Sequence, residues 1–217
     1  MEWYEPEVRA LIEGLKQKIL PAQPAVFYGS SSIRMWTDLA TDLKETRAVN
    51  LAFGGSTLAA CVHFFERLVP PVHPASLVVY AGDNDLGDGR RPAEVLLSFR
   101  TLAGLVQASL PNVPFGFISI KPSSSRVALL ASIARTNELI QLEIAKYPCA
   151  YYINVFDAML DAAGRPMPKL FLEDGLHLSR AGYKLWARLL EPYRHRIFTS
   201  LLPDASANRL PSGVSES

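Results

Sequence analysis

The sequence predicts an α/β protein, a three-layer α/β/α sandwich built around a parallel sheet of five strands. Five short apolar runs, rich in Val, Ile, Phe or Tyr, lack a clear alternation with polar residues. This is typical of strands that are buried on both faces of a parallel sheet. Longer segments with helical periodicity lie between the runs. Strands that alternate with helices favour right-handed crossovers, which place helices on both faces of the sheet.

The elements can be placed in order along the chain. The first helix is expected over residues 8–19, where apolar residues recur at helical spacing: Val8, Leu11, Ile12, Leu15 and Ile19. The five strands are expected at residues 25–28, 48–51, 77–80, 115–120 and 151–155. Three further helices are expected at residues 58–69, 92–109 and 127–146. A last helix is expected to start at Arg180, because Ser179 is a suitable N-cap.

Composition and charge limit the class of protein. Of the 217 residues, 49% are hydrophobic and 20% are charged, so the chain can bury a sizeable core. We expect one domain over residues 1–202 and a disordered tail over residues 203–217, which are polar and without pattern. The net charge of +1, without a basic block, argues against a nucleic-acid partner and against binding to a membrane surface. No apolar run approaches the roughly 18 residues that span a bilayer.

The N-terminal segment and the cysteines favour a cytoplasmic protein. Residues 1–20 are acidic and amphipathic, unlike a secretory signal. Cys61 and Cys149 both lie in apolar surroundings, and we expect two buried free thiols, as in a reducing compartment. The cysteines and histidines show no spacing typical of metal ligands, so we expect no metal site.

Small, polar or charged residues follow the predicted strands. Ser31, in a run of three serines after a glycine, follows the first strand, Gly55 follows the second and Asn84 follows the third. Asp174 and His177 lie beyond the fifth strand, ahead of the last helix. In such a sheet, ligands bind at the carboxyl ends of the strands. These five residues are therefore expected to share one rim of the sheet.

The chemistry of the five residues is complementary. A serine such as Ser31 is a poor nucleophile unless a neighbouring base takes its proton, and His177 can do so because imidazoles titrate near neutrality. Asp174 can hold the imidazole in one tautomer and stabilise its protonated form. The backbone N–H groups of Ser31 and Gly55, with the side-chain amide of Asn84, can donate to a developing oxyanion.

Each pattern alone has an ordinary structural explanation. A serine beside a glycine is usually part of a turn, as is a Gly-x-Asn-Asp run, and Asp-x-x-His more often starts a helix. Here Ser179 can cap the last helix by itself, which leaves Asp174 and His177 without that explanation. All four patterns, in order and at the expected ends of elements, favour a hydrolase site.

Two basic residues near the predicted rim have open roles. Lys121 follows the fourth strand and is interpreted either as a substrate contact or as a solvated loop lysine. Arg34 either lines the cleft or lies with its stem over Trp36.

Acidic residues and a second serine cluster also lie near the predicted site. Asp83 and Asp85 flank Asn84 and either orient it or satisfy the backbone of the turn, the second being favoured. Residues 123–125, three consecutive serines, have no evident partner and are expected to form a loop.

Together these residues resemble the SGNH (GDSL-type) hydrolase family of esterases and lipases. The resemblance spans about residues 25–192, and its most specific stretch is FLEDGLHLSRAGYKLWA. The four blocks of the family correspond to Ser31, Gly55, Asn84 and the pair Asp174 and His177. The resemblance implies a flavodoxin-like sheet of order 2-1-3-4-5, no cofactor and an acyl-serine intermediate.

The chain departs from the family pattern at two positions. Ser30 stands where the family usually has the aspartate of Gly-Asp-Ser. The assignment of the nucleophile to Ser31, rather than to Ser30 or Ser32, therefore depends on how the three serines align with the family pattern. Ala52 stands where glycine is common in the second block.

The leading functional hypothesis is a serine hydrolase that cleaves small-molecule carboxylic esters, with short acyl groups expected. A thioesterase, a carbohydrate deacetylase or an acyltransferase would use the same residues. A non-catalytic binding module of the same fold is a second class, favoured only by Ser30. A nucleotide-binding protein is a third, but the loop after the first strand lacks a phosphate-binding glycine pattern. The natural ester and the oligomeric state stay open.

Overall fold

The structure, a computed structural model, describes residues 1–44 and 46–198. Its centre is a five-stranded parallel sheet of order β2-β1-β3-β4-β5, which confirms the predicted sheet and its topology. The strands are β1 (Ala25–Gly29), β2 (Ala48–Asn50), β3 (Ser76–Tyr80), β4 (Phe115–Ile118) and β5 (Ala150–Ile153). Every residue of β1, β3 and β4 is buried, as expected for strands covered on both faces.

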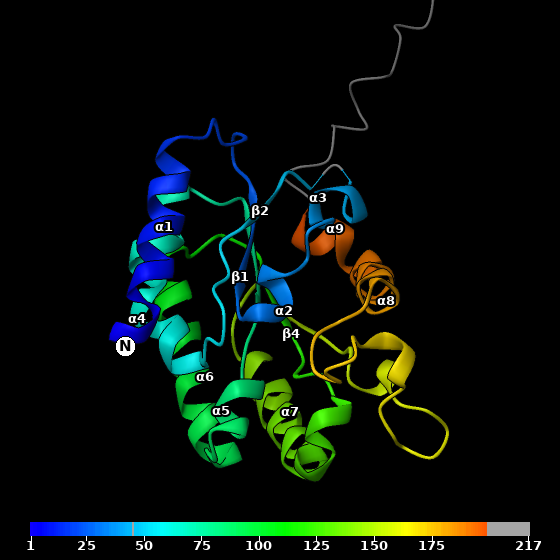
Figure 1. The fold of residues 1–217 in the computed structure, drawn as a ribbon. Coiled ribbons are helices and arrows are strands. Elements are labelled where there is room, and N and C mark those ends of the chain that lie inside the picture. The colour runs from blue at the N-terminus through cyan, green and yellow to red at the C-terminus, as the bar shows by residue number, and fades with distance from the viewer. Residues whose placement is uncertain (45, 199–217) are drawn as a thin grey trace, which may run out of the picture.

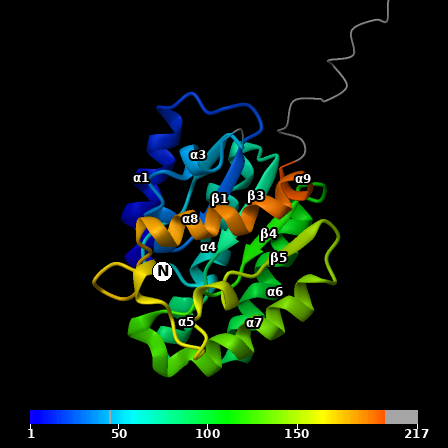
Figure 2. The ribbon, with the colours of Figure 1, turned by 90° about the vertical axis from the view of Figure 1, so that its right-hand side faces the viewer.

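Helices cover both faces of this sheet (Figures 1 and 2). On one face lie α1 (Glu5–Lys16), α4 (Leu58–Leu68), α6 (Pro92–Ser109) and α7 (Leu130–Ile144). On the other face lie α2 (Ser31–Arg34), α3 (Leu39–Asp42), α8 (Arg180–Leu190) and α9 (Arg194–Ile197). The remaining α-helix is α5 (Asp83–Gly87), directly after β3. The 3₁₀ segments are η1 (Glu2–Tyr4), η2 (Pro70–Val72), η3 (Ser124–Leu129), η4 (Asp157–Met159), η5 (Pro168–Leu170) and η6 (Glu191–Tyr193).

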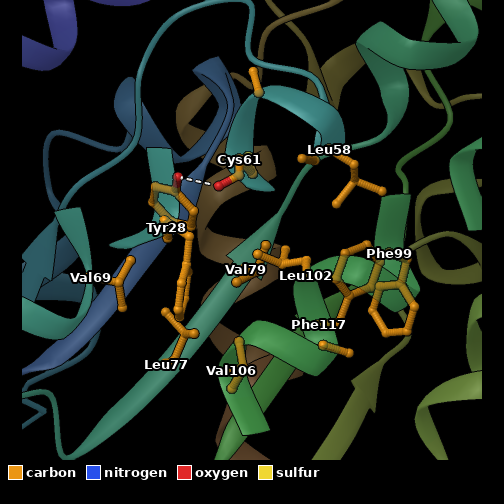
Figure 3. Close-up of a cluster of buried hydrophobic side chains, with 14 of the residues drawn as sticks. Tyr28, Leu58, Cys61, Val69, Leu77, Val79, Phe99, Leu102, Val106 and Phe117 are labelled. Atoms are coloured by element: carbon orange, nitrogen blue, oxygen red, sulfur yellow. Dashed lines mark hydrogen bonds between the residues drawn. The ribbon is translucent and has the colours of Figure 1, made fainter. Parts of the chain in front are cut away.

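The core on the α4 and α6 face joins aromatic rings to aliphatic side chains (Figure 3). The rings of Phe99 and Phe117 meet edge to face at 5.0 Å between centroids. The Tyr28 hydroxyl is buried and donates to the Cys61 carbonyl at 2.8 Å, so this polar atom is satisfied. Burial raises the pKa of the Cys61 thiol, which keeps it protonated.

The opposite core attaches α8 to the segment that follows α2. Trp36 stacks on Tyr183 at 5.2 Å between ring centroids and meets Trp186 at 6.1 Å. The Arg180 guanidinium pairs with the Asp42 carboxylate close to the same contact. This packing fixes the start of α8 beside α2.

Several expectations need correction. Cys149 is exposed and has φ 57, so only Cys61 is a buried thiol. The helix expected over residues 8–19 spans Glu5–Lys16, and Ile19 is fully exposed beyond its end. The segment expected as helix from residue 127 starts earlier, as the 3₁₀ turn η3. The expected tail, residues 203–217, lies outside the described residues.

Within the described part of the chain, no helix is both long enough and apolar enough to cross a membrane.

Candidate active site

The end of β1 presents the run of three serines in a fixed geometry. Gly29 has φ +131, and a Cβ at this position would lie 1.9 Å from the Tyr80 carbonyl oxygen, so the close approach of β1 to β3 requires glycine. The Ser30 N–H donates to that same carbonyl at 2.9 Å. Ser30 and Ser32 are buried, whereas Ser31, the first residue of α2, is half-buried. Ser31 is therefore the serine of this run that is open to the surface.

The turn before α8 holds Asp174 and His177 side by side. Gly175 takes the left-handed conformation, with φ +64. One Asp174 oxygen, Oδ1, accepts the backbone N–H groups of Leu176 at 2.8 Å and of His177 at 2.9 Å. The other, Oδ2, lies 2.6 Å from His177 Nδ1. The hydrogen bond from His177, and then those from the two backbone N–H groups, lower the pKa of Asp174 to about 2.

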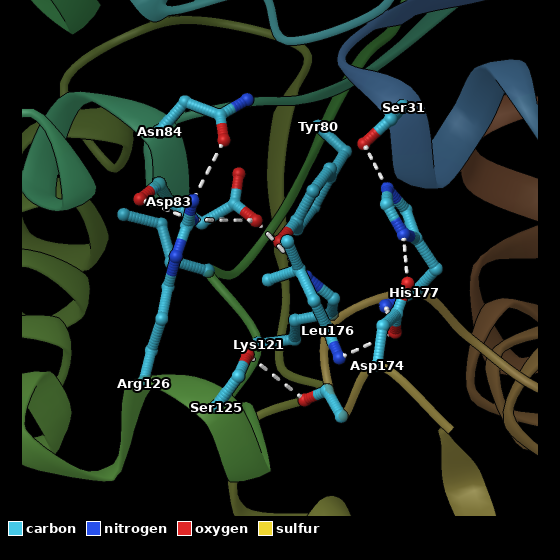
Figure 4. A network of polar contacts seen from close by, with 12 residues as sticks. Ser31, Tyr80, Asp83, Asn84, Lys121, Ser125, Arg126, Asp174, Leu176 and His177 are labelled. Atoms are coloured by element: carbon cyan, nitrogen blue, oxygen red, sulfur yellow. Dashed lines mark hydrogen bonds and ion pairs between the residues drawn. The ribbon is translucent and has the colours of Figure 1, made fainter. Parts of the chain in front are cut away.

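His177 also reaches the serine run from this turn. Its Nε2 lies 3.2 Å from Ser31 Oγ, although the two residues are 146 positions apart in the sequence. Figure 4 shows Ser31, His177 and Asp174 joined in one chain of hydrogen bonds. Because an ionised Asp174 only accepts, Nδ1 carries the proton, and Nε2 of the neutral ring accepts from the Ser31 hydroxyl. The geometry allows His177 to take the Ser31 proton as that oxygen attacks.

Asn84 lies in the first turn of α5, between two groups of opposite hydrogen-bonding character. Its Nδ2 donates to the Ser56 carbonyl at 3.1 Å. Its Oδ1 accepts from Arg126 Nη2 at 3.0 Å. The amide has two N–H donors, so one remains after the bond to Ser56. Sequence reasoning missed Arg126, which lies in η3 and meets Asn84 only through the tertiary fold.

Gly55 lies in the loop that connects β2 to α4. Its carbonyl accepts from the Tyr4 hydroxyl at 3.1 Å, which ties the loop to the N-terminal segment. The start of α4 is held by Asp85, whose Oδ2 accepts the Leu58 N–H at 2.8 Å. Two hydrogen bonds, from Asn84 to the Ser56 carbonyl and from the Leu58 N–H to Asp85, thus join the segments that follow β2 and β3.

Lys121 lies beneath the rim and has neither of the two predicted roles. Its side chain is 1% exposed, and its Nζ lies 2.9 Å from Asp83 Oδ2 and 3.2 Å from the Tyr80 hydroxyl. Burial opposes ionisation of Asp83, but the charges of Lys121 and Arg126 outweigh it and hold the pKa of Asp83 below its usual value. Lys121 is a partner of a buried carboxylate, because Asp83 faces it from the neighbouring strand end.

Arg34 lies at the end of α2, three residues after Ser31. Its side chain is about half exposed, and Nε lies 3.5 Å from Glu7 Oε1 of α1. It therefore lies on the α1 side of the serine run. Its interpretation as a cleft residue stays a prediction.

The two aspartates that flank Asn84 differ in their partners. Asp83 pairs with Lys121 and Arg126, and Asp85 accepts from the backbone at the start of α4. Burial raises the pKa of Asp85 to about 6, while the hydrogen bond from the Leu58 N–H acts in the opposite direction. Of the two predicted alternatives, the favoured one, in which the aspartates satisfy the backbone of their own turn, does not describe the contacts of Asp83 with Lys121 and Arg126.

The described residues contain no group of three His, Cys, Asp or Glu side chains placed to hold a metal ion.

The fold of this chain is shared with several known proteins. Among solved structures, the chain is similar to a candidate platelet activating factor from Streptococcus pneumonia, with a TM-score of 0.77 and 22% identity over 88% of this chain and 94% of that one. It is also similar to a GDSL-like lipase from Bacteroides thetaiotaomicron, with a TM-score of 0.69 and 18% identity over 85% of this chain and 95% of that one. A third similar structure is a family 3 carbohydrate esterase from Clostridium thermocellum, with a TM-score of 0.64 and 18% identity over 83% of this chain and 99% of that one. At these identities the likeness shows a shared fold.

The comparison by sequence is more specific. No curated protein matches the chain. The model of the GDSL-like lipase/acylhydrolase family matches residues 22–185, a span that contains Ser31, Gly55, Asn84 and the turn before α8. The chain therefore belongs to the GDSL-like lipase/acylhydrolase family.

Proposed function

We propose that this protein is a serine hydrolase that cleaves carboxylic esters through an acyl-serine intermediate. The observation that carries the proposal is the hydrogen-bonded chain from Asp174 through His177 to Ser31. A serine, an imidazole and a carboxylate in this order form an activated nucleophile, whatever the fold that carries them. Membership of an acylhydrolase family supports ester hydrolysis as the reaction class.

In the first half of the reaction, Ser31 Oγ attacks the ester carbonyl carbon while its proton passes to His177 Nε2. The carbonyl oxygen becomes an oxyanion, and the backbone N–H groups of Ser31 and Gly55 and the free N–H of Asn84 are the proposed donors to it. The intermediate then collapses, the bond to the alcohol oxygen breaks, and His177 returns the proton to that oxygen. Asp174 stays ionised and holds the protonated ring.

In the second half, water replaces the alcohol. His177 takes a proton from the water, whose oxygen attacks the acyl carbon, and the same donors receive the second oxyanion. Collapse breaks the acyl bond to Ser31 Oγ, which regains its proton from His177. The products are a carboxylic acid and the free enzyme.

The proposed substrates are soluble esters with short acyl groups, from acetyl to about hexanoyl. The side chain of Asp174 is 46% exposed and that of His177 is 26% exposed, so water has access to the site. An open site offers little apolar wall to a long acyl chain. The fold shared with a carbohydrate esterase is compatible with small ester groups on polar alcohols.

The test is a pair of serine variants assayed on p-nitrophenyl acetate. Ser31→Ala should lower kcat by about 10⁴ to 10⁶ while the protein stays folded. Ser30→Ala removes a buried hydroxyl of the same run and is the matched control, with a far smaller expected loss. Wild-type turnover in Ser31→Ala, or labelling of a different serine by a fluorophosphonate probe, would contradict the assignment.

A further inference from the structure

We infer that Arg126 is a positioning residue that holds the amide of Asn84 with its free N–H toward the site of the oxyanion, an inference that rests on the proposed function. The Arg126 guanidinium contacts both the backbone and the side chain of the α5 turn. Its Nη1 donates to the Asp83 carbonyl oxygen at 2.6 Å, and its Nη2 donates to Asn84 Oδ1 at 3.0 Å. The side chain is 19% exposed, so these bonds are largely shielded from water.

The partners of Asn84 leave only one orientation of its amide. Arg126 can only donate, and the Ser56 carbonyl can only accept. A rotation of the amide by 180° would place its NH₂ against the guanidinium and its oxygen against the carbonyl, and both contacts would be repulsive. In Figure 4 the Asn84 oxygen faces Arg126, and its nitrogen lies on the side of Ser31.

The charge of Arg126 is not needed to neutralise the buried carboxylate nearby. Lys121 already pairs with Asp83 at 2.9 Å, whereas Arg126 Nη1 lies 3.4 Å from the same oxygen. The contacts that remain to be explained are the two hydrogen bonds of Arg126 to the α5 turn, and they act on the orientation of Asn84.

The segment that carries Arg126 also contacts the other half of the site. The backbone N–H and the hydroxyl of Ser125 donate to the Gly175 carbonyl at 3.1 and 3.3 Å. Gly175 lies between Asp174 and His177, and a Cβ on it would come within 3.2 Å of Ser125 N. Residues 125 and 126 thus contact both the acid–base turn and the oxyanion donor (Figure 4). Residues 123–125 were predicted to be a loop without partners, and for Ser125 this is wrong.

Loss of Arg126 should therefore reduce kcat and leave KM nearly unchanged. Removal of one oxyanion donor typically costs about 10² to 10³ in kcat. In Arg126→Ala the Asn84 amide is still present but free to rotate, so its N–H is in position only part of the time. The loss of kcat should therefore be smaller, about 10- to 100-fold. KM should change less than about threefold, because the amide acts once the oxyanion forms.

The experiment is a double-mutant cycle on p-nitrophenyl acetate with wild type, Arg126→Ala, Asn84→Ala and the double variant. The double variant should be within about threefold of Asn84→Ala alone, because Arg126 acts through Asn84. Arg126→Lys keeps the charge and one of the two hydrogen bonds, and should recover part of kcat. Arg135→Ala removes an exposed arginine that pairs with Glu138, and should leave kcat unchanged.

A second measurement reads the contact without turnover. In ¹H–¹⁵N spectra, the side-chain NH₂ pair of Asn84, assigned as the pair missing from Asn84→Ala, should shift or broaden in Arg126→Ala and stay in place in Arg135→Ala. Wild-type kcat in Arg126→Ala, multiplicative losses in the double variant, or an unchanged Asn84 pair would overturn the inference. Failure of the proposed function would give a different result, namely turnover that does not depend on Ser31. In that case the NH₂ pair of Asn84 would still test its contact with Arg126.

Discussion

At the scale of single residues, the ionisation of Asp174 decides how activity depends on pH. Its carboxylate accepts from His177 and from two backbone N–H groups, which lower its pKa to about 2. Asp174 therefore remains an anion throughout the weakly acidic and neutral range and can hold the Nδ1 proton of His177 there. The acid side of the activity profile should therefore report one protonation, that of His177.

We expect log(kcat/KM) to fall with a slope of one on the acid side of the profile, because a protonated His177 cannot accept the Ser31 proton. The measurement is kcat/KM on p-nitrophenyl acetate from pH 4 to 8. Asp85→Asn is the control, because it removes the buried carboxyl whose pKa of about 6 lies in this range. A slope of two that persists in Asp85→Asn would show that a second group must ionise.

At the scale of elements, the start of α4 depends on a carboxylate that is costly to ionise. Asp85 is 3% exposed and accepts the Leu58 N–H, and burial raises its pKa from 3.8 to about 6. Between these two values the folded protein binds more protons at Asp85 than the unfolded chain does. Its contribution to the free energy of unfolding is therefore greatest below about pH 4 and is lost as the pH rises through 6.

Asp85→Asn should remove this dependence, since the side-chain oxygen of Asn can still accept from Leu58. A shift of this size corresponds to about 3 kcal/mol. Urea unfolding at pH 4, 5 and 6.5 should show that the free energy of unfolding of Asp85→Asn, taken relative to that of the wild type, rises with pH. Asp88→Asn, at the exposed position directly after α5, should follow the wild-type curve. Parallel curves for Asp85→Asn and wild type would refute the assignment.

The junction of β1 and β3 gives a second prediction at this scale. Gly29→Ala places a Cβ against the Tyr80 carbonyl at a φ that favours glycine, and should lower the free energy of unfolding by at least about 3 kcal/mol. Gly14→Ala is the control, because nothing lies within 4 Å of its Cβ in α1, and the change should stabilise the helix by about 0.5–1 kcal/mol. Equal unfolding midpoints in urea for the two variants would contradict this view of the junction.

Elements that repeat a pattern were predictable from sequence, whereas single turns were not. The five strands lie where the apolar runs predict them, although β4 and β5 each end two residues earlier than expected, and Ser179 is the N-cap as predicted, because apolar runs and a capping residue are local signals. The turns α2 and α5, with four and five residues, are too short to show helical periodicity and were predicted as loops. The residues of the candidate site lie at the ends of elements, where a buried parallel sheet gathers side chains from distant positions.

What the sequence could not predict were contacts between charged groups from different loops. Lys121 is buried because Asp83, 38 positions earlier, faces it across the sheet edge. Arg126 meets Asn84 over a separation of 42 positions. A single sequence carries no local pattern for such pairs, since burial of a charge depends on its partner in space.

At the scale of the whole molecule, the location of the site on an open rim predicts substrate size. Burial of a methylene contributes about 0.8 kcal/mol, but only where apolar atoms cover it. With Asp174 and His177 both partly exposed, a long acyl chain gains little. We expect kcat/KM to be highest for acyl groups between acetyl and about hexanoyl.

The measurement is kcat/KM across p-nitrophenyl esters from acetate to palmitate, with Ser31→Ala as the blank for each ester. We also expect no rise in rate at lipid surfaces. A steady increase toward palmitate would contradict the expectation. It would mean that a surface assigned here to helix packing accepts an acyl chain.

The packing of Trp36 on α8 gives the molecule an internal optical signal for the completion of its site. The ring centroids of Trp36 and Trp186 lie 6.1 Å apart, so docking of α8 should change their fluorescence in the step that brings His177 to Ser31, 146 positions away in the sequence. Trp3 is 85% exposed and contributes a background that a Trp3→Phe variant removes. Because one docking step buries the two rings and brings His177 to Ser31, fluorescence and hydrolytic activity should return during refolding with one rate constant, and a nascent chain can gain its activity only after α8 has been synthesised.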